Sequence, residues 1–157
     1  MSGRLTRVLF SADLTCADLQ GIIRVSRAHG NEHRLDHDVA KLPHHCSYLS
    51  LAPDKDTSPV PEVRWLFEER GQEGEILVSS SNPIPQHGTN DPPHHKAAAF
   101  YRQVSDGLLG EFVVTMEHPK VSTPERLVID ISASGASRKK RIIVGSAAAT
   151  RPARRAG

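Results

Sequence analysis

Hydrophobic and polar residues follow two different periods along the chain, which predict short strands and helices in a mixed order. Residues 4–10 have the apolar content of a strand. An apolar stripe at helical spacing comes next and predicts a helix; its members are Leu14, Leu19, Ile22 and Ile23. Ser11 or Asp13 is a candidate cap for this helix, and Gly30-Asn31 is its stop signal. A second helical pattern begins at Pro43, a residue tolerated in a first helical turn, and ends at Pro53-Asp54.

The second half of the chain favours strands. Residues 63–68 alternate between apolar and polar side chains, Gly71–Gly74 supplies a turn, and residues 75–79 return, which predicts a hairpin. We expect a proline-rich loop over 82–95, a helix over 97–104, a strand over 111–117, and two strand candidates at 127–131 and 141–144. The resulting order predicts an α+β, ferredoxin-like βαββαβ fold with a histidine-rich insert and an extra C-terminal hairpin.

Composition and charge narrow the class of protein. The chain has 157 residues, enough for one domain, and no apolar run near the roughly 18 residues of a membrane span, so we expect no membrane partner. Two cysteines, Cys16 and Cys46, make no disulfide framework and favour a reduced, cytoplasmic protein.

The charges are unevenly distributed. Up to Asp130 there are 13 basic and 18 acidic residues, whereas seven basic residues and no acidic one follow: Arg138, Lys139, Lys140, Arg141, Arg151, Arg154 and Arg155. We therefore expect a folded body over 1–133 and a partly disordered basic tail over 134–157. Such a tail suits contact with a polyanion such as nucleic acid, or serves only as a solubilising end.

Nine histidines raise the question of a metal site. His29, Glu32 and His33 spell H-x-x-E-H, a zinc motif that needs one continuous helix, but Gly30-Asn31 interrupts it. His33 and His37 form an i,i+4 pair only if they are helical, and the adjacent His44, His45 and Cys46 point in different directions. We expect no metal site and no cofactor, with a histidine-rich metal-binding protein as a weaker alternative.

Four segments, in order over residues 4–120, carry a resemblance to a known family. They are Leu5-Thr6-Arg7-Val8, the stretch from His45 to Asp54, the pair Trp65–Glu68 and Gly74–Ser80, and Phe112–Thr115 with Pro119-Lys120. Together they resemble the first ferredoxin-like domain of the CRISPR repeat-processing endoribonuclease of the type I-E Cascade complex, within the RAMP superfamily. The chain departs from that family at Ala52, where the family has Phe, and in a longer segment over 15–42.

The resemblance implies an antiviral-defence protein that cuts RNA without metal. A base would take the proton of a ribose 2′-hydroxyl, which attacks the adjacent phosphate. His45 is then the candidate acid/base, with Tyr48 or a basic residue of the tail as its candidate partner. The candidate RNA-binding residues are Lys120, Arg138, Lys139, Lys140 and Arg141. The implied partners are a repeat-hairpin RNA and Cascade-type protein subunits.

The acidic body argues against broad RNA binding by residues 1–130 alone, because phosphate contacts dominate such affinity. The alternative is a non-catalytic ferredoxin-like interaction module, whose sheet docks a partner protein and whose basic tail tethers it to nucleic acid.

Overall fold

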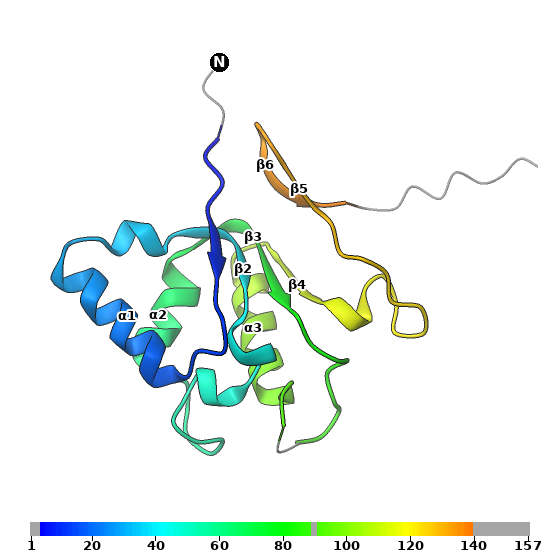
Figure 1. Ribbon diagram of the computed structural model, residues 1–157, viewed down its shortest axis with the longest axis horizontal. Helices are drawn as coiled ribbons and strands as arrows, with labels where there is room; N and C mark the ends of the chain where they lie inside the picture. The colour runs from blue at the N-terminus through cyan, green and yellow to red at the C-terminus, as the bar shows by residue number, and fades with distance from the viewer. Residues whose placement is uncertain (1–3, 89–90, 140–157) are drawn as a thin grey trace, which may run out of the picture.

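The computed structural model describes residues 4–88 and 91–139, which form a mixed α/β domain (Figure 1). Its larger sheet holds four strands: β1 (Val8–Phe10), β2 (His37–Lys41), β3 (Gly71–Ser79) and β4 (Glu111–Val114). Three helices alternate with them: α1 (Cys16–Ala28), α2 (Pro61–Glu69) and α3 (His95–Gly107). A hairpin of β5 (Ile129–Ser132) and β6 (Gly135–Arg138) follows.

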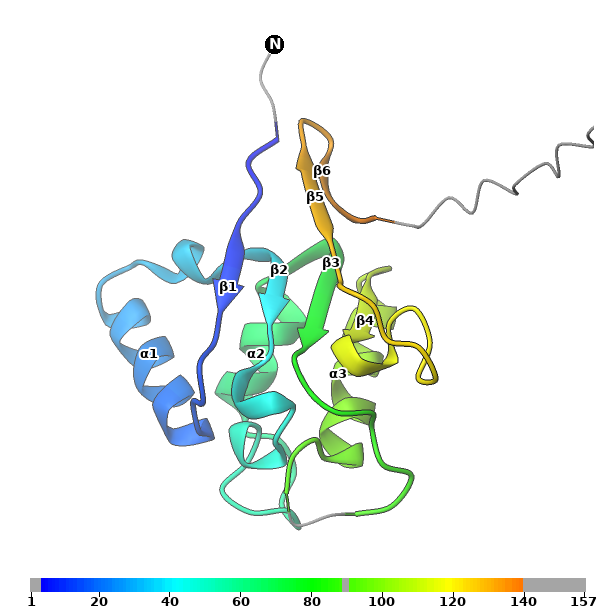
Figure 2. The same cartoon turned by 45° about the vertical axis from the view of Figure 1, so that its right-hand side comes forward.

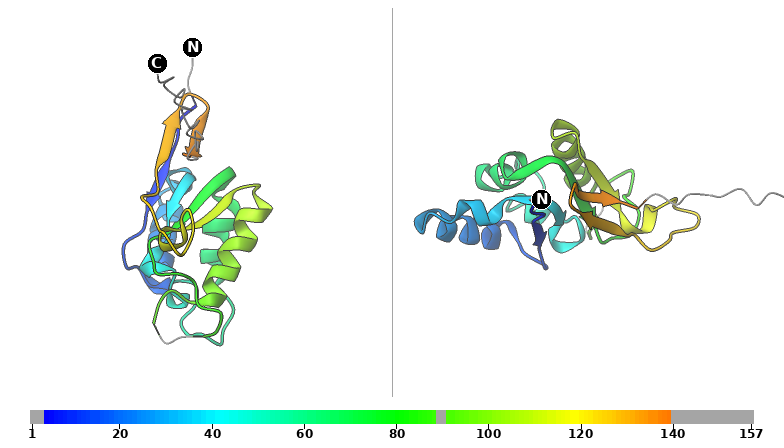
Figure 3. Two further views of the ribbon diagram at one scale, coloured as in Figure 1. Left: turned by 90° about the vertical axis from the view of Figure 1, so that its right-hand side faces the viewer. Right: turned by 90° about the horizontal axis from the view of Figure 1, so that it is seen from above.

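The larger sheet has the strand order β1-β2-β3-β4, and all of its neighbouring strands are parallel (Figure 2). Each helix is therefore a crossover between two adjacent strands. Because such crossovers are right-handed, a sheet that keeps sequence order has all of its helices on one face. Figure 3 shows this arrangement, with the helices on one side of the sheet and the β5–β6 hairpin on the other.

Side chains that alternate along the strands divide the interior into two clusters. On the helix side, Ala40 and Leu77 pack against buried residues of α1, α2 and α3, among them Ile23, Phe67 and Tyr101. On the opposite side, a smaller cluster forms from Val39, Ile76 and Val113, against which Leu127, Ile129 and Ala136 pack. We call this second side the open face, because Leu127, Ile129 and Ala136 cover it only in part.

Local sequence explains where the helices begin. Thr15 caps α1 in a reciprocal capping box with Asp18, and His29 ends the helix ahead of Gly30, whose φ of 64° is left-handed. Pro61 occupies the first turn of α2, where its missing N–H costs nothing. Among the helices that the structure describes, none has the length and apolar character needed to cross a bilayer.

The ferredoxin-like order predicted from the sequence is wrong for this sheet, which contains no antiparallel pair. The error lies at residues 61–69, which form α2 and not the first strand of a hairpin. Val63, Leu66 and Phe67 are the buried residues of this segment, and their spacing is helical. Trp65, which gave the segment its apparent alternation, is only partly buried, with Arg27 stacked over its ring at 4.1 Å.

Other boundaries also differ from the prediction. The helix expected from Pro43 is replaced by two short 3-10 turns at Pro43–His45 and Tyr48–Ser50. The predicted strand at 127–131 is present as β5, and its partner β6 lies at 135–138. The strand expected at 141–144 falls outside the described residues, as does most of the basic tail.

Candidate functional site

The carboxyl ends of the four parallel strands meet at one edge of the sheet, and polar residues follow every strand there. Open α/β sheets bind ligands outside the carboxyl ends of their strands, usually at a point where the strand order reverses, which the order β1-β2-β3-β4 lacks. A cavity of about 460 Å³ opens at this edge and is lined by His45, Ser80, Ser81, Asn82, Pro92, Thr115 and Met116. Its residues come from the segments after β2, β3 and β4.

The turn that presents His45 has an unusual backbone. His44, His45 and Cys46 have φ values of 43°, 52° and 65°, so three consecutive residues with side chains adopt the left-handed region. This conformation costs about 1 kcal/mol or more for each residue. Backbone strain of this kind persists only where surrounding contacts impose it, and it gathers at functional sites.

Backbone hydrogen bonds hold this turn from both sides. The His44 N–H donates to the Ala12 carbonyl at 3.1 Å, which ties the turn to the segment after β1. The Cys46 carbonyl accepts from the His94 N–H at 3.0 Å, at the start of α3. The Cys46 side chain is fully buried behind the turn. His45 is therefore placed by the fold, although its own side chain is half exposed.

The hydrogen bond of His45 defines which of its nitrogens is free. Nδ1 lies 2.6 Å from the backbone carbonyl oxygen of Ser80, which can only accept, so Nδ1 carries the proton and donates it. In the neutral imidazole, Nε2 then has a free lone pair. Asp13 Oδ1 lies 3.7 Å from Nε2, so a carboxylate stands where it would stabilise the imidazolium formed when Nε2 takes a proton. This arrangement can perform general-base chemistry.

Tyr48, the predicted partner of His45, has other contacts. Its hydroxyl donates to the Thr57 carbonyl at 2.7 Å, and its ring lies against His94 with centroids 5.5 Å apart. Burial raises the pKa of the Tyr48 hydroxyl. Tyr48 is not among the residues that line the cavity.

The three predicted RNA-binding residues that the structure describes, Lys120, Arg138 and Lys139, are not among the residues that line the cavity. Arg138 is paired with Glu111 at 2.7 Å and contacts His118 Nδ1 at 3.2 Å. Lys120 and Lys139 are exposed. Lys140 and Arg141 lie outside the described residues. Neither Lys nor Arg lines the cavity within the described ranges.

Apart from His94 and His95, whose rings stack with centroids 4.8 Å apart, the remaining histidines that the structure describes do not gather in one place. The H-x-x-E-H motif is split, as expected, because His29 ends α1 and Glu32 and His33 lie in a separate 3-10 turn. His37 is buried in β2 beside Glu75, with His37 Nε2 and Glu75 Oε2 3.3 Å apart. In residues 4–88 and 91–139, no three His, Cys, Asp or Glu side chains gather as metal ligands would.

Sequence reasoning missed Asp13, Ser80, Ser81 and Thr115 at this site. The signal was a run of polar residues, Ser79 to Asn82, directly after the apolar core of β3. The run could be assigned to the site only if the strands were known to be parallel. In a parallel sheet, the residues that follow β3 lie beside the segment that follows β2.

Comparison of the chain with protein-family models, with curated proteins and with solved structures finds no match, so the candidate site stands on its own geometry.

Proposed function

We propose that the cavity around His45 is a catalytic site in which the imidazole acts as a general base on a hydroxyl group, and that the hydroxyl is the ribose 2′-OH of RNA. The observation that carries the reaction type is the 2.6 Å contact between His45 Nδ1 and the Ser80 carbonyl, which leaves Nε2 free to accept a proton. The choice of RNA is supported by the seven basic residues that follow Asp130.

The proposed reaction needs no metal. Nε2 takes the proton of the 2′-hydroxyl, and the oxygen attacks the adjacent phosphorus. The bond from phosphorus to the 5′-oxygen breaks, and that oxygen takes a proton from solvent. The products are a 2′,3′-cyclic phosphate and a free 5′-hydroxyl. Asp13 stabilises the imidazolium until the proton returns to solvent.

Binding and cutting are assigned to different parts of the chain. The lining of the cavity contributes no positive charge within the described residues, so affinity for phosphates is expected from the basic residues after Asp130. CRISPR repeat RNA and Cascade-type subunits remain proposals that rest on the sequence resemblance alone. The parallel sheet gives them no support, because the resemblance implied a ferredoxin-like fold.

The test is cleavage of a labelled hairpin RNA in the presence and absence of EDTA. His45→Ala is expected to abolish cleavage and keep binding. His45→Asn is a second variant for the same test, since asparagine tolerates the left-handed backbone better than most residues. His44→Ala, in the same turn, is the matched control and is expected to cut. A substrate with a 2′-deoxy sugar at the cut site is expected to stay intact.

Two results would contradict the proposal: cleavage that requires a divalent ion, or cleavage that survives in both His45 variants.

A second candidate is a non-catalytic binding module. It is favoured by the apolar side chains on the open face, where Val8 and Phe10 are 38% and 81% exposed. If the chain binds the hairpin RNA without cutting it, and if the His45 variants bind it equally well, the result would support this candidate over the first.

A further inference from the structure

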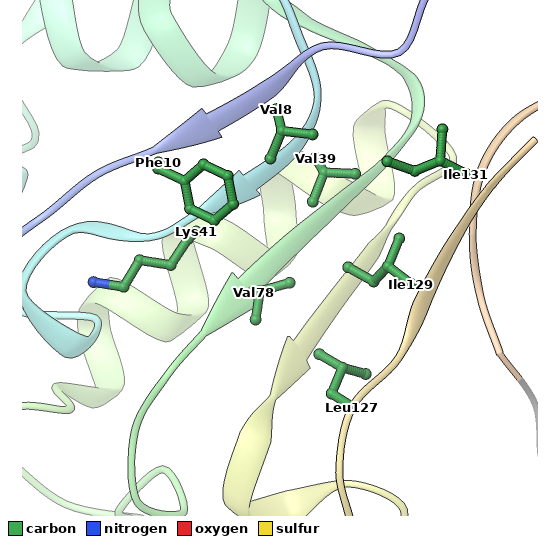
Figure 4. Close-up of a pocket in the computed structure, with 8 residues that line it drawn as sticks. All are labelled: Val8, Phe10, Val39, Lys41, Val78, Leu127, Ile129 and Ile131. Carbon is green, nitrogen blue, oxygen red and sulfur yellow. The ribbon is translucent and has the colours of Figure 1, made fainter.

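A second hollow lies on the open face, away from His45. Figure 4 shows it between the strands β1, β2 and β3 on one side and the segment 127–131 on the other. It is a groove of about 320 Å³ lined by Val8, Phe10, Val39, Lys41, Val78, Leu127, Ile129 and Ile131. This volume lies at the lower end of the range for small-molecule sites, about 300–1,000 Å³.

The groove exists because the open face is covered from one side only. Leu127, Ile129 and Ala136 pack over Val39 of β2, Ile76 of β3 and Val113 of β4. Toward the β1 edge the cover ends, and Phe10 and Ile131 remain 81% and 60% exposed. Single exposed apolar residues are ordinary, but a contiguous set that lines a concave surface indicates a binding site.

Lys41 is the one charged residue of the lining. The strand register aligns it with Phe10 of β1 and Val78 of β3, in a row that faces the groove. Figure 4 shows its aliphatic stem passing beside the Phe10 ring, with the ammonium group directed away from Leu127 and Ile129. Within the described part of the chain, no carboxylate forms an ion pair with its ammonium group. The groove thus combines an aliphatic wall with one unpaired cation at its end.

We propose that this groove binds an amphiphilic carboxylate, a medium-chain fatty acid, with its acyl chain against Val8, Val39 and Val78 and its carboxylate at Lys41. Seven of the eight lining residues are apolar, and six of those seven are aliphatic, which suits a flexible hydrocarbon chain. The ammonium group of Lys41 complements the single negative charge of the ligand.

A nucleic-acid base is the main competing occupant, since Phe10 could stack on one. The charge of the body argues against it. The 13 basic and 18 acidic residues up to Asp130 disfavour a polyanion, whereas a ligand with one charge needs only Lys41. Phe10 is also the only aromatic residue of the lining, where single-strand binding sites place several.

The test is a titration of the full chain with decanoate below its micelle concentration, followed by the methyl NMR signals of Val8, Val39 and Val78. Saturable shifts of these signals are expected. Octanoate is expected to bind more weakly, because each buried methylene contributes about four-fold in affinity. Lys41→Gln is expected to weaken the binding of decanoate at least five-fold and to leave the affinity for decanol unchanged. Arg24→Gln, on the exposed face of α1, is the matched control.

A second variant tests the groove wall. Ile131→Glu places a negative charge beside the acyl chain and is expected to abolish decanoate binding, whereas Val25→Glu, at an equally exposed position on α1, is expected to have no effect. Thermal unfolding of each variant shows whether it is folded. Failure of RNA cleavage does not bear on these results, because neither Lys41 nor Ile131 lines the His45 cavity.

Four outcomes would overturn the proposal. The first is equal affinity of decanoate for the original chain and Lys41→Gln. The second is a set of decanoate-induced shifts that lie outside the groove. The third is shifts at Val8, Val39 and Val78 that single-stranded RNA causes and decanoate does not. The fourth is a dimer in sedimentation that Ile131→Glu dissociates, which would assign the groove to a second copy of the chain.

Discussion

The residue next to the candidate base shows how tightly the turn after β2 is held. Cys46 is fully buried, and this burial raises the pKa of its thiol to about 12. Ser79 lies close enough to oppose that shift through a side-chain hydrogen bond, but burial has the larger effect. Since the thiolate is the reactive form, we expect Cys46 to react slowly although it adjoins the candidate base.

We therefore predict that neither cysteine reacts with a thiol reagent at pH 8 in the folded chain. Burial also raises the pKa of Cys16, so both thiols stay protonated. Labelling with Ellman's reagent is expected to be slow under native conditions and to reach two thiols per chain in guanidinium chloride. Rapid native labelling of Cys46 would mean that the turn after β2 opens readily.

His37 and Glu75 form a buried polar pair inside the larger sheet. Both are fully buried, and no hydrogen bond to the Glu75 carboxylate is present within the described residues. A Cβ at Gly71 would collide with the Glu75 carboxylate, so the glycine keeps room for this pair. The pair lies at the amino ends of the strands, opposite the His45 cavity, which suits a structural role.

We predict that His37→Leu lowers the free energy of unfolding by about 1–3 kcal/mol, because it leaves the polar Glu75 carboxyl group buried beside an apolar side chain. The double variant His37→Leu/Glu75→Leu is expected to recover most of that loss, since two apolar side chains leave no buried polar group without a partner. Urea unfolding of the single and double variants measures both values. A double variant as unstable as the sum of the two single variants would contradict this account.

At the scale of elements, α3 begins with a cap that depends on pH. His94 precedes the helix, and its Nδ1 accepts a hydrogen bond from the Lys96 N–H at 3.3 Å. Burial, with a smaller contribution from neighbouring His95, lowers the pKa of His94. The folded chain therefore keeps His94 neutral at pH values where the unfolded chain takes up a proton, and protonation of Nδ1 would remove the cap.

We predict that the folded state loses stability as the pH falls through about 6.5, the ordinary pKa of an unfolded histidine. His94→Asn keeps a cap that does not titrate and is expected to reduce this loss, by up to about the 1 kcal/mol that such a cap contributes. His87→Asn, at an exposed position, is the matched control. The measurement is thermal unfolding at pH 5 and pH 7. Identical pH dependence in His94→Asn and the original chain would contradict the prediction.

The elements also show what sequence reasoning could reach. Helix α1 was predictable because its cap, its apolar stripe and its glycine stop all agree. Helix α2 was not predictable, because its sequence fits two patterns equally well. Val63, Trp65 and Phe67 alternate as in a strand, whereas Val63, Leu66 and Phe67 have the spacing of a helix. Only the packing of this segment against α1 and α3 decides between the two patterns.

The same limit applies to the candidate site. His45 was singled out from the sequence for its position at a helix start, but the structure places it in a left-handed turn. Asp13 and Ser80 meet it because β1, β2 and β3 run parallel, and one helix misread as a strand reverses the direction of every later strand. Long-range pairing of this kind is not encoded in local periodicity.

At the scale of the whole molecule, most of the basic residues that follow Asp130 come, in the sequence, after the described part of the chain. Arg138 belongs to β6 and is paired with Glu111, so it is part of the fold. Five of the seven basic residues that follow Asp130 lie beyond Lys139. A truncation after Lys139 therefore removes most of this charge and leaves the described hairpin intact.

We predict that this truncation weakens binding of a hairpin RNA at low salt and flattens its salt dependence, because fewer phosphate contacts release fewer counterions. Filter binding at several salt concentrations measures both effects. The truncated chain is expected to keep its thermal unfolding temperature. RNA affinity equal to that of the full chain would show that the terminal basic residues do not bind RNA.

The sequential order of the strands has a consequence during synthesis of the chain. Each crossover joins neighbouring strands, so the sheet can assemble from β1 onward as the chain leaves the ribosome. The residues that partly cover the open face, Leu127, Ile129 and Ala136, emerge after β4. At about 5–20 residues per second, a nascent chain that has completed β4 exposes Val39, Ile76 and Val113 for roughly a second or more before this cover arrives. A fragment that ends at Lys120 is therefore expected to bind a hydrophobic dye and aggregate, whereas one that ends at Lys139 stays monomeric in sedimentation.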